Sequence, residues 1–257
     1  MDELLKYQLE QVTRLSHDLK EPLNTVYGAF QILQMHDSGE DARKQYYDAA
    51  ERNIRKMTRM INHFTEFYRV TQKEMKINPK MIDGRRLVES LCNAVRDCFW
   101  NGKPELIVDI QGEGLVCLDE LLLEHAFLNL VSNGIKATKE EPCKLEITAF
   151  FEDGGMSLSV RDFGIGIAEE HHKIIFEPLI QLGEFKKGTG LGLSIVSEVV
   201  KLHQGELCLE SEPGKGSTFT IKIPFQQPVE SNSTDLEQFD PDMDRLQRTK
   251  IALAEVL

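Results

Sequence analysis

The sequence contains no run of about 18 apolar residues, so nothing in it predicts a helix that crosses a membrane. Its first residues form an amphipathic, charged stretch rather than the apolar core of a signal peptide. Together these absences predict a cytoplasmic location and no direct insertion of this segment into a membrane.

Paired cysteines and an excess of positive charge are also missing. The five cysteines are scattered and form no C-x-x-C pair, which indicates reduced thiols in a cytosolic protein rather than disulfides or a structural zinc site. The formal net charge of -12 and the pI near 5.1 argue against nucleic acid as a main partner. The 257 residues are enough for one large domain or two modest ones.

The first 76 residues predict a hairpin of two long helices. Apolar residues recur every three or four positions from 9 to 33, and a second stripe runs from 46 to 67, with a turn-like composition at 36–41 between them. A hairpin of this size cannot bury its apolar face alone, so we expect dimerisation into a four-helix bundle. Asn53 interrupts the second stripe, and it either sets the register of that bundle or is simply a partly exposed asparagine.

Residues 77–225 predict a two-layer α/β sandwich, because strand-like and helix-like segments alternate in mixed order. The predicted elements are a strand pair at 105–110 and 114–119, a helix at 120–138, strands at 144–152 and 156–164, a helix at 190–203 and a hairpin around "PGKG". Residues 226–257 predict an acidic tail or a linker that could lead to a further domain. The sequence does not assign the last stretch, "TKIALAEVL".

The segment "RLSHDLKEPLN" (14–24) places a histidine on the polar side of the first helix. Asp18 follows His17 and can hold one ring nitrogen, which leaves the other nitrogen as a nucleophile. Pro22 cannot donate the helical hydrogen bond to the carbonyl of Asp18, so it loosens this turn. The segment is typical of a nucleophile on a helix built to bend, although a solitary exposed histidine usually has no function.

Two asparagines share a face of the predicted helix at 120–138, because Asn129 and Asn133 are four residues apart. An amide oxygen is a hard ligand that suits Mg²⁺ between a protein and substrate phosphates. The alternative is a pair of amides that only pack against a neighbouring helix.

Two glycine clusters, "DFGIGI" (162–167) and "GTGLGLSIV" (188–196), flank an irregular stretch, and the second opens a helix. Glycines let the backbone approach phosphates, and a helix N-terminus offers free N–H groups to an anion. The spacing is neither that of a Walker P-loop nor that of a dinucleotide fingerprint. Asp162 could accept a hydrogen bond from an exocyclic amine such as that of adenine.

The chain resembles the catalytic core of the sensor histidine kinases over residues 10–225. "SHDLKEPLN" is similar to the H-box, "NLVSNGIKAT" to the N-box and "DFGIGI" to the G1 box, while "IIFEPL" and "GTGLGL" are similar to the F-box and the G2 box. The resemblance implies a phosphoacceptor hairpin followed by a Bergerat-type ATP-binding sandwich, a homodimer, a response-regulator receiver domain as partner, and ATP with Mg²⁺ as cofactors.

The resemblance also implies roles for residues. His17 would be the phosphoacceptor with Asp18 beside it, Asn133 the Mg²⁺ ligand, Asp162 the reader of adenine, and residues 168–187 a mobile ATP lid. The remaining nucleotide-binding residues that it implies are Asn129, Lys136, Gly164, Gly166, Phe176, Gly188, Thr189, Gly190, Leu191, Gly192 and Thr218.

The sequence departs from the family pattern in places. Ala137 stands where an aromatic residue is common, and Glu21 stands where many relatives have a Thr or Asn that supports dephosphorylation of the receiver. The main prediction is an ATP:protein-histidine phosphotransferase. The alternatives are an ATPase clamp of the same sandwich and a non-catalytic scaffold. The clamp is disfavoured because Asn129 occupies the position of the water-activating Glu in such ATPases.

Overall fold

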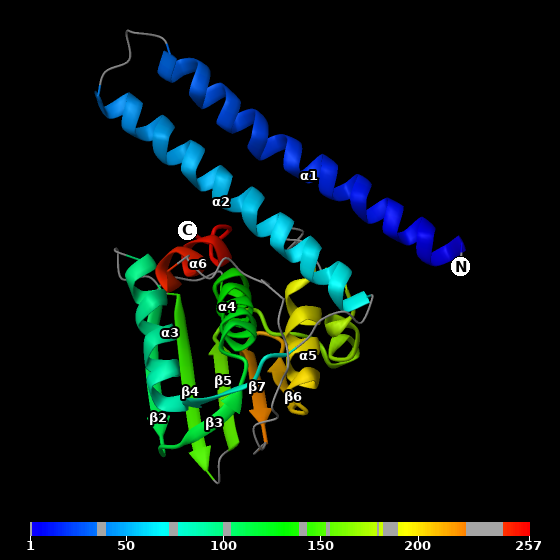
Figure 1. Ribbon diagram of the computed structural model, residues 1–257, viewed down its shortest axis with the longest axis vertical. Helices are drawn as coiled ribbons and strands as arrows, with labels where there is room; N and C mark the ends of the chain where they lie inside the picture. The colour runs from blue at the N-terminus through cyan, green and yellow to red at the C-terminus, as the bar shows by residue number, and fades with distance from the viewer. Residues whose placement is uncertain are drawn as a thin grey trace.

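A helical hairpin lies along one side of an α/β sandwich in the computed structural model (Figure 1). The structure describes residues 2–34, 40–71, 77–99, 104–138, 143–152, 155–178, 180–181, 190–224 and 244–257. None of the helices in these ranges combines the length and the apolar content that a membrane span needs.

The hairpin consists of α1 (Asp2–Gln34) and α2 (Glu40–Thr71), which pack against each other. Pro22 lies inside α1 and its side chain is buried, so the helix continues through it. The amide of Asn53 donates a 2.8 Å hydrogen bond to the Ala49 carbonyl of its own helix. In the described chain, this contact keeps the amide on α2 itself.

The sandwich is built on a five-stranded sheet in the order β2-β4-β5-β7-β6. The strands are β2 (Glu105–Gln111), β4 (Lys144–Glu152), β5 (Gly155–Asp162), β6 (Glu206–Glu212) and β7 (Gly216–Ile223). Only β2 and β4 pair in parallel; the other neighbours are antiparallel. Side chains of β4 alternate between buried and exposed, since successive residues of a strand point to opposite faces.

Three helices cover one face of this sheet: α3 (Gly84–Cys98), α4 (Glu120–Ala137) and α5 (Gly192–Leu202) (Figure 1). Their apolar sides and the inward side chains of the strands form the hydrophobic core. Asp119 caps α4 by accepting hydrogen bonds from the backbone N–H groups of Leu121 and Leu122, both at 3.1 Å. The short helices η1 (Glu169–His171) and η2 (Ile174–Phe176) follow β5.

One predicted pairing is wrong. Segment 105–110 does not pair with 114–119: β3 (Leu115–Leu118) forms a separate two-stranded sheet with β1 (Lys80–Asp83). Gly112 lies between the two strands with a φ of 76°, and a Cβ there would clash with the Phe151 carbonyl, so the chain bends at a position that only glycine suits. The predicted helix at 120–138, the helix at 190–203 and the hairpin around "PGKG" are confirmed as α4, α5 and β6–β7.

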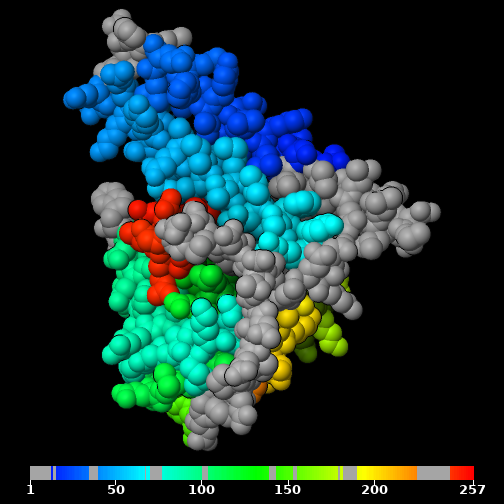
Figure 2. Space-filling view, in the orientation of Figure 1, coloured from blue at the N-terminus to red at the C-terminus, as the bar shows by residue number. Residues whose placement is uncertain are grey.

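The last described segment forms α6 (Arg245–Ala252), which the sequence left unassigned. Asp244 caps it by accepting a 2.9 Å hydrogen bond from the backbone N–H of Gln247. The helix packs against α2, α3 and α4, and Leu253 just beyond it is fully buried in the core. Figure 2 shows this red segment lodged between α2 and the sandwich.

Candidate active site

The predicted nucleophile lies on the exposed side of α1. The His17 side chain is 87% exposed, and its Nδ1 lies 3.5 Å from a carboxylate oxygen of Asp18. A contact at this nitrogen favours a proton on Nδ1 and leaves Nε2 with its lone pair facing solvent. The structure therefore brings together the nucleophile and the acidic neighbour that the sequence predicted.

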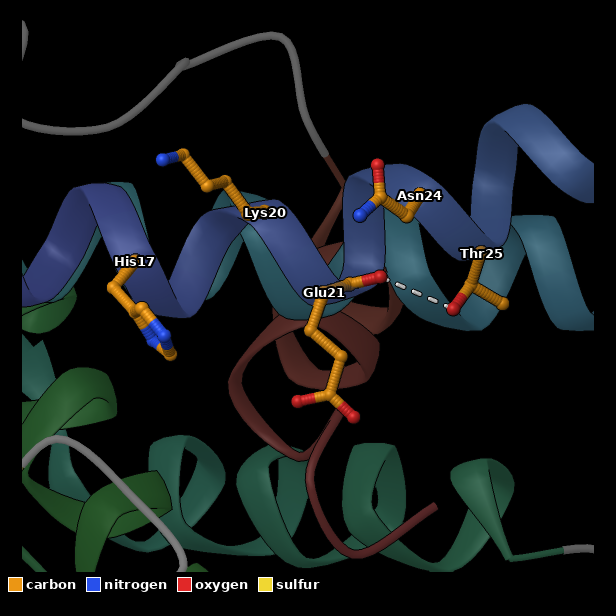
Figure 3. Close-up of a pocket in the computed structure, with 5 residues that line it drawn as sticks. All are labelled: His17, Lys20, Glu21, Asn24 and Thr25. Atoms are coloured by element: carbon orange, nitrogen blue, oxygen red, sulfur yellow. Dashed lines mark hydrogen bonds between the residues drawn. The ribbon is translucent and has the colours of Figure 1, made fainter.

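An open hollow of about 510 Å³ lies along the same helix, lined by His17, Lys20, Glu21, Asn24 and Thr25. Figure 3 shows the His17 and Glu21 side chains on one side of α1, whereas Lys20 points to another side. The hydroxyl of Thr25 donates a 3.2 Å hydrogen bond to the Glu21 carbonyl, as the dashed line marks. A carboxylate thus stands one turn from the histidine and lines the same hollow.

Asp162 lies at the end of β5 with only 4% of its surface exposed. Its Oδ1 accepts hydrogen bonds from the backbone N–H groups of Gly164, at 2.8 Å, and Ser217, at 3.3 Å. Burial raises the pKa of this carboxyl, and the two backbone hydrogen bonds oppose the rise. Both bonds converge on Oδ1, which leaves Oδ2 as the oxygen that suits an exocyclic amine.

Glycines bring the backbone into close contact around Asp162. A Cβ on Gly164 would lie 2.4 Å from the Ala137 carbonyl oxygen, and one on Gly134 would lie 3.3 Å from Cβ of Asp162. Gly166 has a φ of 66°, and a Cβ there would meet the Glu212 carbonyl. These glycines hold the end of α4 and the loop after β5 together, so larger residues would push the walls of this site apart.

The two N-box asparagines occupy different surroundings. Asn129 is buried, its amide donates a 3.1 Å hydrogen bond to the His125 carbonyl, and its Oδ1 would lie 3.0 Å from a Cβ on Gly192 of α5. Asn133, one turn later, is only half-buried. Asn129 therefore packs between α4 and α5, while Asn133 keeps access to a ligand.

The other predicted nucleotide-binding residues differ in how the structure places them. Gly190, with a φ of 70°, and the buried Leu191 precede α5, whose first residue is Gly192. Thr218 lies on β7 opposite Arg161 of β5. The ring of Phe176 meets the ring of Phe219 edge-on at 6.4 Å, so it packs on the sheet. Gly188 and Thr189 lie outside the described residues, as do positions 179 and 182–187 of the predicted lid.

Lys136 makes a contact that the sequence did not predict. Its ammonium group pairs with the carboxylate of Glu255, which also lies 3.4 Å from a guanidinium nitrogen of Arg59 on α2. Burial lowers the pKa of Lys136, with the Arg59 charge adding to the effect, and the nearby Glu255 opposes it. A carboxylate therefore pairs with a side chain that the resemblance assigns to nucleotide binding.

Glu124 on α4 is also held from α6. Only 1% of it is exposed, and its two oxygens accept hydrogen bonds from Arg248, at 2.7 and 2.9 Å, and from Arg245, at 3.1 Å. Arg245 also contacts Glu120 and Ser90. The pKa of Arg248 is raised, chiefly by its hydrogen bonds to Glu124. The Glu124 carboxylate is therefore enclosed by two guanidinium groups that balance its charge.

A second buried polar contact joins α2 to α4. His125 Nδ1 lies 2.5 Å from a carboxylate oxygen of Glu66, and Arg59 donates a 3.1 Å hydrogen bond to the Ser132 hydroxyl. His63, also buried there, has a pKa well below its usual value because burial penalises the charged ring and Arg59 adds a like charge. The hairpin is thus fixed to the helix that carries the N-box asparagines.

Two family models match the chain at the places where this geometry lies. Residues 7–73 match the His Kinase A (phospho-acceptor) domain, and residues 118–227 match the family described as Histidine kinase-, DNA gyrase B-, and HSP90-like ATPase. The chain belongs to the sensor histidine kinase family. The predicted helical phosphoacceptor hairpin and α/β ATP-binding sandwich of these kinases are confirmed.

Similar proteins include other histidine kinases and sensors. Phytochrome-like protein Cph1 of Synechocystis sp. is 32% identical over 82% of this chain and 28% of that protein. Autoinducer 2 sensor kinase/phosphatase LuxQ of Vibrio vulnificus is 30% identical over 86% of this chain and 27% of that protein. Full-length ShkA, solved with AMPPNP, has a TM-score of 0.61 and 25% identity over 86% of this chain and 47% of that chain. The chain thus spans little more than a quarter of the length of Cph1 and LuxQ.

Sequence reasoning about this histidine kinase core missed Glu255, Arg59, and the pair formed by Arg245 and Arg248. These residues meet α4 from segments far away in the chain, so no local motif connects them. The segment "LQRTKIALAEVL" (246–257) combines cationic residues with an apolar end. This pattern is typical of a short helix that packs on an acidic surface, and it is the signal from which the contact could have been predicted.

Proposed function

We propose that this histidine kinase core transfers the γ-phosphoryl group of ATP to His17 and then passes it to an aspartate of a response-regulator receiver domain. The observation that carries the proposal is the presence, in one chain, of an exposed His17 with Asp18 at Nδ1 and a glycine-walled site around the buried Asp162. A nucleophile and a purine-binding carboxylate are the two parts that this reaction needs.

The reaction follows from the positions of these groups. Nε2 of His17 attacks the γ-phosphorus of ATP, the bond from phosphorus to the bridging oxygen breaks, and ADP leaves. Asp18 keeps the proton on Nδ1 and stabilises the cationic ring as the new N–P bond forms. The protein mainly positions the reactants and neutralises charge, as in other phosphoryl transfers.

We assign the Mg²⁺ that accompanies ATP to Asn133. The described residues contain no group of three or more His, Cys, Asp and Glu side chains that could hold a metal ion by themselves. Mg²⁺ usually binds one or two protein oxygens together with substrate phosphates, so a single amide on the accessible side of α4 fits it. When bound, the ion would screen the charge of the phosphates.

The active form in this proposal is a homodimer. Large apolar side chains of the hairpin are exposed: Leu23, Tyr27 and Phe30 on α1, and Tyr47, Ile54, Ile61 and Tyr68 on α2. The four on α2 recur every seven residues, which is the spacing of a helix seam that meets another helix. A second copy of the hairpin would cover this surface as a four-helix bundle.

A water-activating ATPase fits the site less well. Such an enzyme needs a carboxylate free to act as a general base near the metal-binding asparagine. Asn129 stands one turn before Asn133, and the nearest preceding carboxylate on α4, Glu124, is enclosed by Arg245 and Arg248. Neither side chain can take a proton from water at that place.

Incubation with ATP labelled at the γ-phosphate tests the proposed function. The protein should acquire label that is labile in acid and stable in alkali, as a phosphohistidine is. His17→Gln should abolish this label and leave the affinity for a non-hydrolysable ATP analogue within about twofold of the wild type, because His17 lies outside the nucleotide site. Lys80→Gln, at an exposed position of β1, serves as control. Label that persists in His17→Gln would identify another nucleophile.

A further inference from the structure

The carboxylate of Glu255 lies against Lys136 near the C-terminal end of α4, the helix that carries the two N-box asparagines. It contacts Lys136 of α4 and lies 3.4 Å from Arg59 of α2, so one side chain of the C-terminal segment joins the hairpin to the sandwich. Only 15% of the Glu255 side chain and 4% of the Arg59 side chain are exposed. Because the contact is largely shielded from water, the attraction between its charges is stronger than in a surface ion pair.

The rest of the segment anchors this carboxylate. Leu253 is buried in the core of the sandwich, and Arg245 and Arg248 hold Glu124 of the same helix α4. Backbone hydrogen bonds from Leu253 to Thr249 and from Val256 to Leu253, both at 2.9 Å, keep the turn before Glu255 compact. These contacts fix the position of the C-terminal segment and therefore of the Glu255 carboxylate.

The same contact holds the hairpin in an arrangement that separates the reactants. α2 lies between α1 and the sandwich, so the helix that carries His17 is on the far side of α2 from α4 (Figure 1). Arg59, through Glu255 and Ser132, and the pair of Glu66 and His125 are polar contacts that hold α2 there. Movement of His17 to the nucleotide requires these links to open.

We propose that residues 244–257 form an autoinhibitory clasp, in which Glu255 occupies Lys136 in place of a nucleotide phosphate and ties α2 to α4. ATP and the clasp then compete for the same ammonium group, and nucleotide binding releases Arg59 from Glu255, which removes one of the contacts that hold the hairpin. This inference rests on the proposed function and on the nucleotide-binding role that the family resemblance implies for Lys136. It adds a regulatory state to the proposed kinase.

Competition between the clasp and the nucleotide should lower the apparent affinity for nucleotide by a measurable factor. If the clasp is closed in about nine molecules of ten, the apparent affinity for nucleotide is reduced about tenfold, because only the open fraction binds. Linkage also requires the reverse effect, so that bound nucleotide lowers the population of the closed clasp.

The test compares Glu255→Gln with the wild type in the full chain. Glu255→Gln keeps the shape of the side chain and removes its charge, so we expect about five- to tenfold tighter binding of a non-hydrolysable ATP analogue with Mg²⁺. Autophosphorylation should rise at low ATP concentrations and approach the wild-type rate at saturation. Glu210→Gln, an exposed position on β6, is the control matched in charge and chemistry and should change neither quantity.

Hydrogen exchange of the wild type provides a readout that needs no variant. Saturating analogue should speed amide exchange at residues 253–257. Unchanged or slower exchange there, or a Glu255→Gln variant whose nucleotide affinity equals or falls below that of the wild type, would overturn the clasp. Tighter nucleotide binding without acid-labile label in any variant would support the clasp and refute the proposed phosphotransfer.

Discussion

Asn129 and Asn133 lie one turn apart on α4, yet the structure surrounds them differently. The amide of Asn129 is bonded to its own helix and packed on Gly192, whereas Asn133 remains half-buried and accessible. Helical spacing alone could not separate these roles, because identical side chains at that spacing carry the same signal; only the family resemblance assigned the metal to Asn133. The difference arises in part from α5, whose first residue, Gly192, packs on Asn129.

Asn133→Asp should weaken the use of Mg·ATP at least about tenfold, which corresponds to about 1.4 kcal/mol, since it alters the metal ligand and adds a negative charge near the phosphates. Asn129→Ala should shift the Mg²⁺ dependence less than about threefold and lower the free energy of unfolding by about 1 kcal/mol through lost packing. Magnesium titrations of autophosphorylation measure the first effect and urea unfolding the second. Superimposable titrations of Asn133→Asp and wild type would refute the assignment.

The carboxylate of Glu21 is expected to slow dephosphorylation of the receiver. Its side chain lies on the same side of α1 as His17, one turn later (Figure 3). Removal of a phosphoryl group from a receiver aspartate needs a water held near phosphorus, and a carboxylate there repels the anionic group. At about 5 Å and an effective dielectric of 20, two like charges repel by roughly 3 kcal/mol, which exposure and salt reduce.

Glu21→Thr should therefore speed dephosphorylation of the receiver by up to about tenfold, the equivalent of about 1.4 kcal/mol, and leave autophosphorylation nearly unchanged. The measurement is the decay of labelled phosphoreceiver with each variant in excess. Glu210→Thr, at an exposed position of β6, controls for loss of one negative charge. A wild type that already strips its receiver rapidly, with Glu21→Thr no faster, would contradict the expectation.

Among the elements, α6 shows how a polar helix is held on a core. Its attachment depends on Arg245 and Arg248, which surround the Glu124 carboxylate, and on Leu253 beyond its end. A buried carboxylate is tolerated only while its cationic partners satisfy it, so removal of one partner costs more than removal of a surface ion pair.

Arg248→Met should lower the free energy of unfolding by about 2 kcal/mol, because Glu124 stays buried with Arg245 as its remaining partner. Arg86→Met is the matched control: Arg86 is 85% exposed and pairs with Asp83, itself 46% exposed, so its loss should cost less than about 1 kcal/mol. Urea denaturation of both variants gives the comparison. Equal midpoints for the two variants would show that α6 contributes nothing through this contact.

Local sequence signals predicted the elements that local forces determine. Helical periodicity identified α4 and α5, and the "PGKG" turn identified the β6–β7 hairpin. The partner of β3 could not be predicted, because β1 lies more than 30 residues earlier and the chain bends at Gly112 before β3 begins. Glu255 could not be placed for the same reason: its contacts with Arg59 and Lys136 join segments that are close only in the folded chain.

At the scale of the whole molecule, the sandwich buries a continuous core, whereas the hairpin leaves a large apolar surface uncovered. α2 faces the sandwich with its polar and buried residues Arg59, His63 and Glu66, and it exposes a different side that carries Ile54 and Ile61. Intramolecular contacts thus occupy one side of the hairpin. The exposed side remains available for a second copy.

Substitution of both exposed isoleucines of α2 by lysine (Ile54→Lys with Ile61→Lys) should convert the dimer to a monomer. Each isoleucine that is buried in the interface stabilises the dimer by about 1.5–3 kcal/mol. Each substitution occurs in both subunits of a symmetric dimer, so the dissociation constant should rise at least about a hundredfold. Sedimentation equilibrium measures this constant. Ile107→Lys is the control, since Ile107 is 40% exposed on β2, comparable with the 49% of Ile54, and lies in the sandwich. A wild type that is monomeric, or a double variant that dimerises as tightly as the control, would exclude the hairpin as the dimer interface.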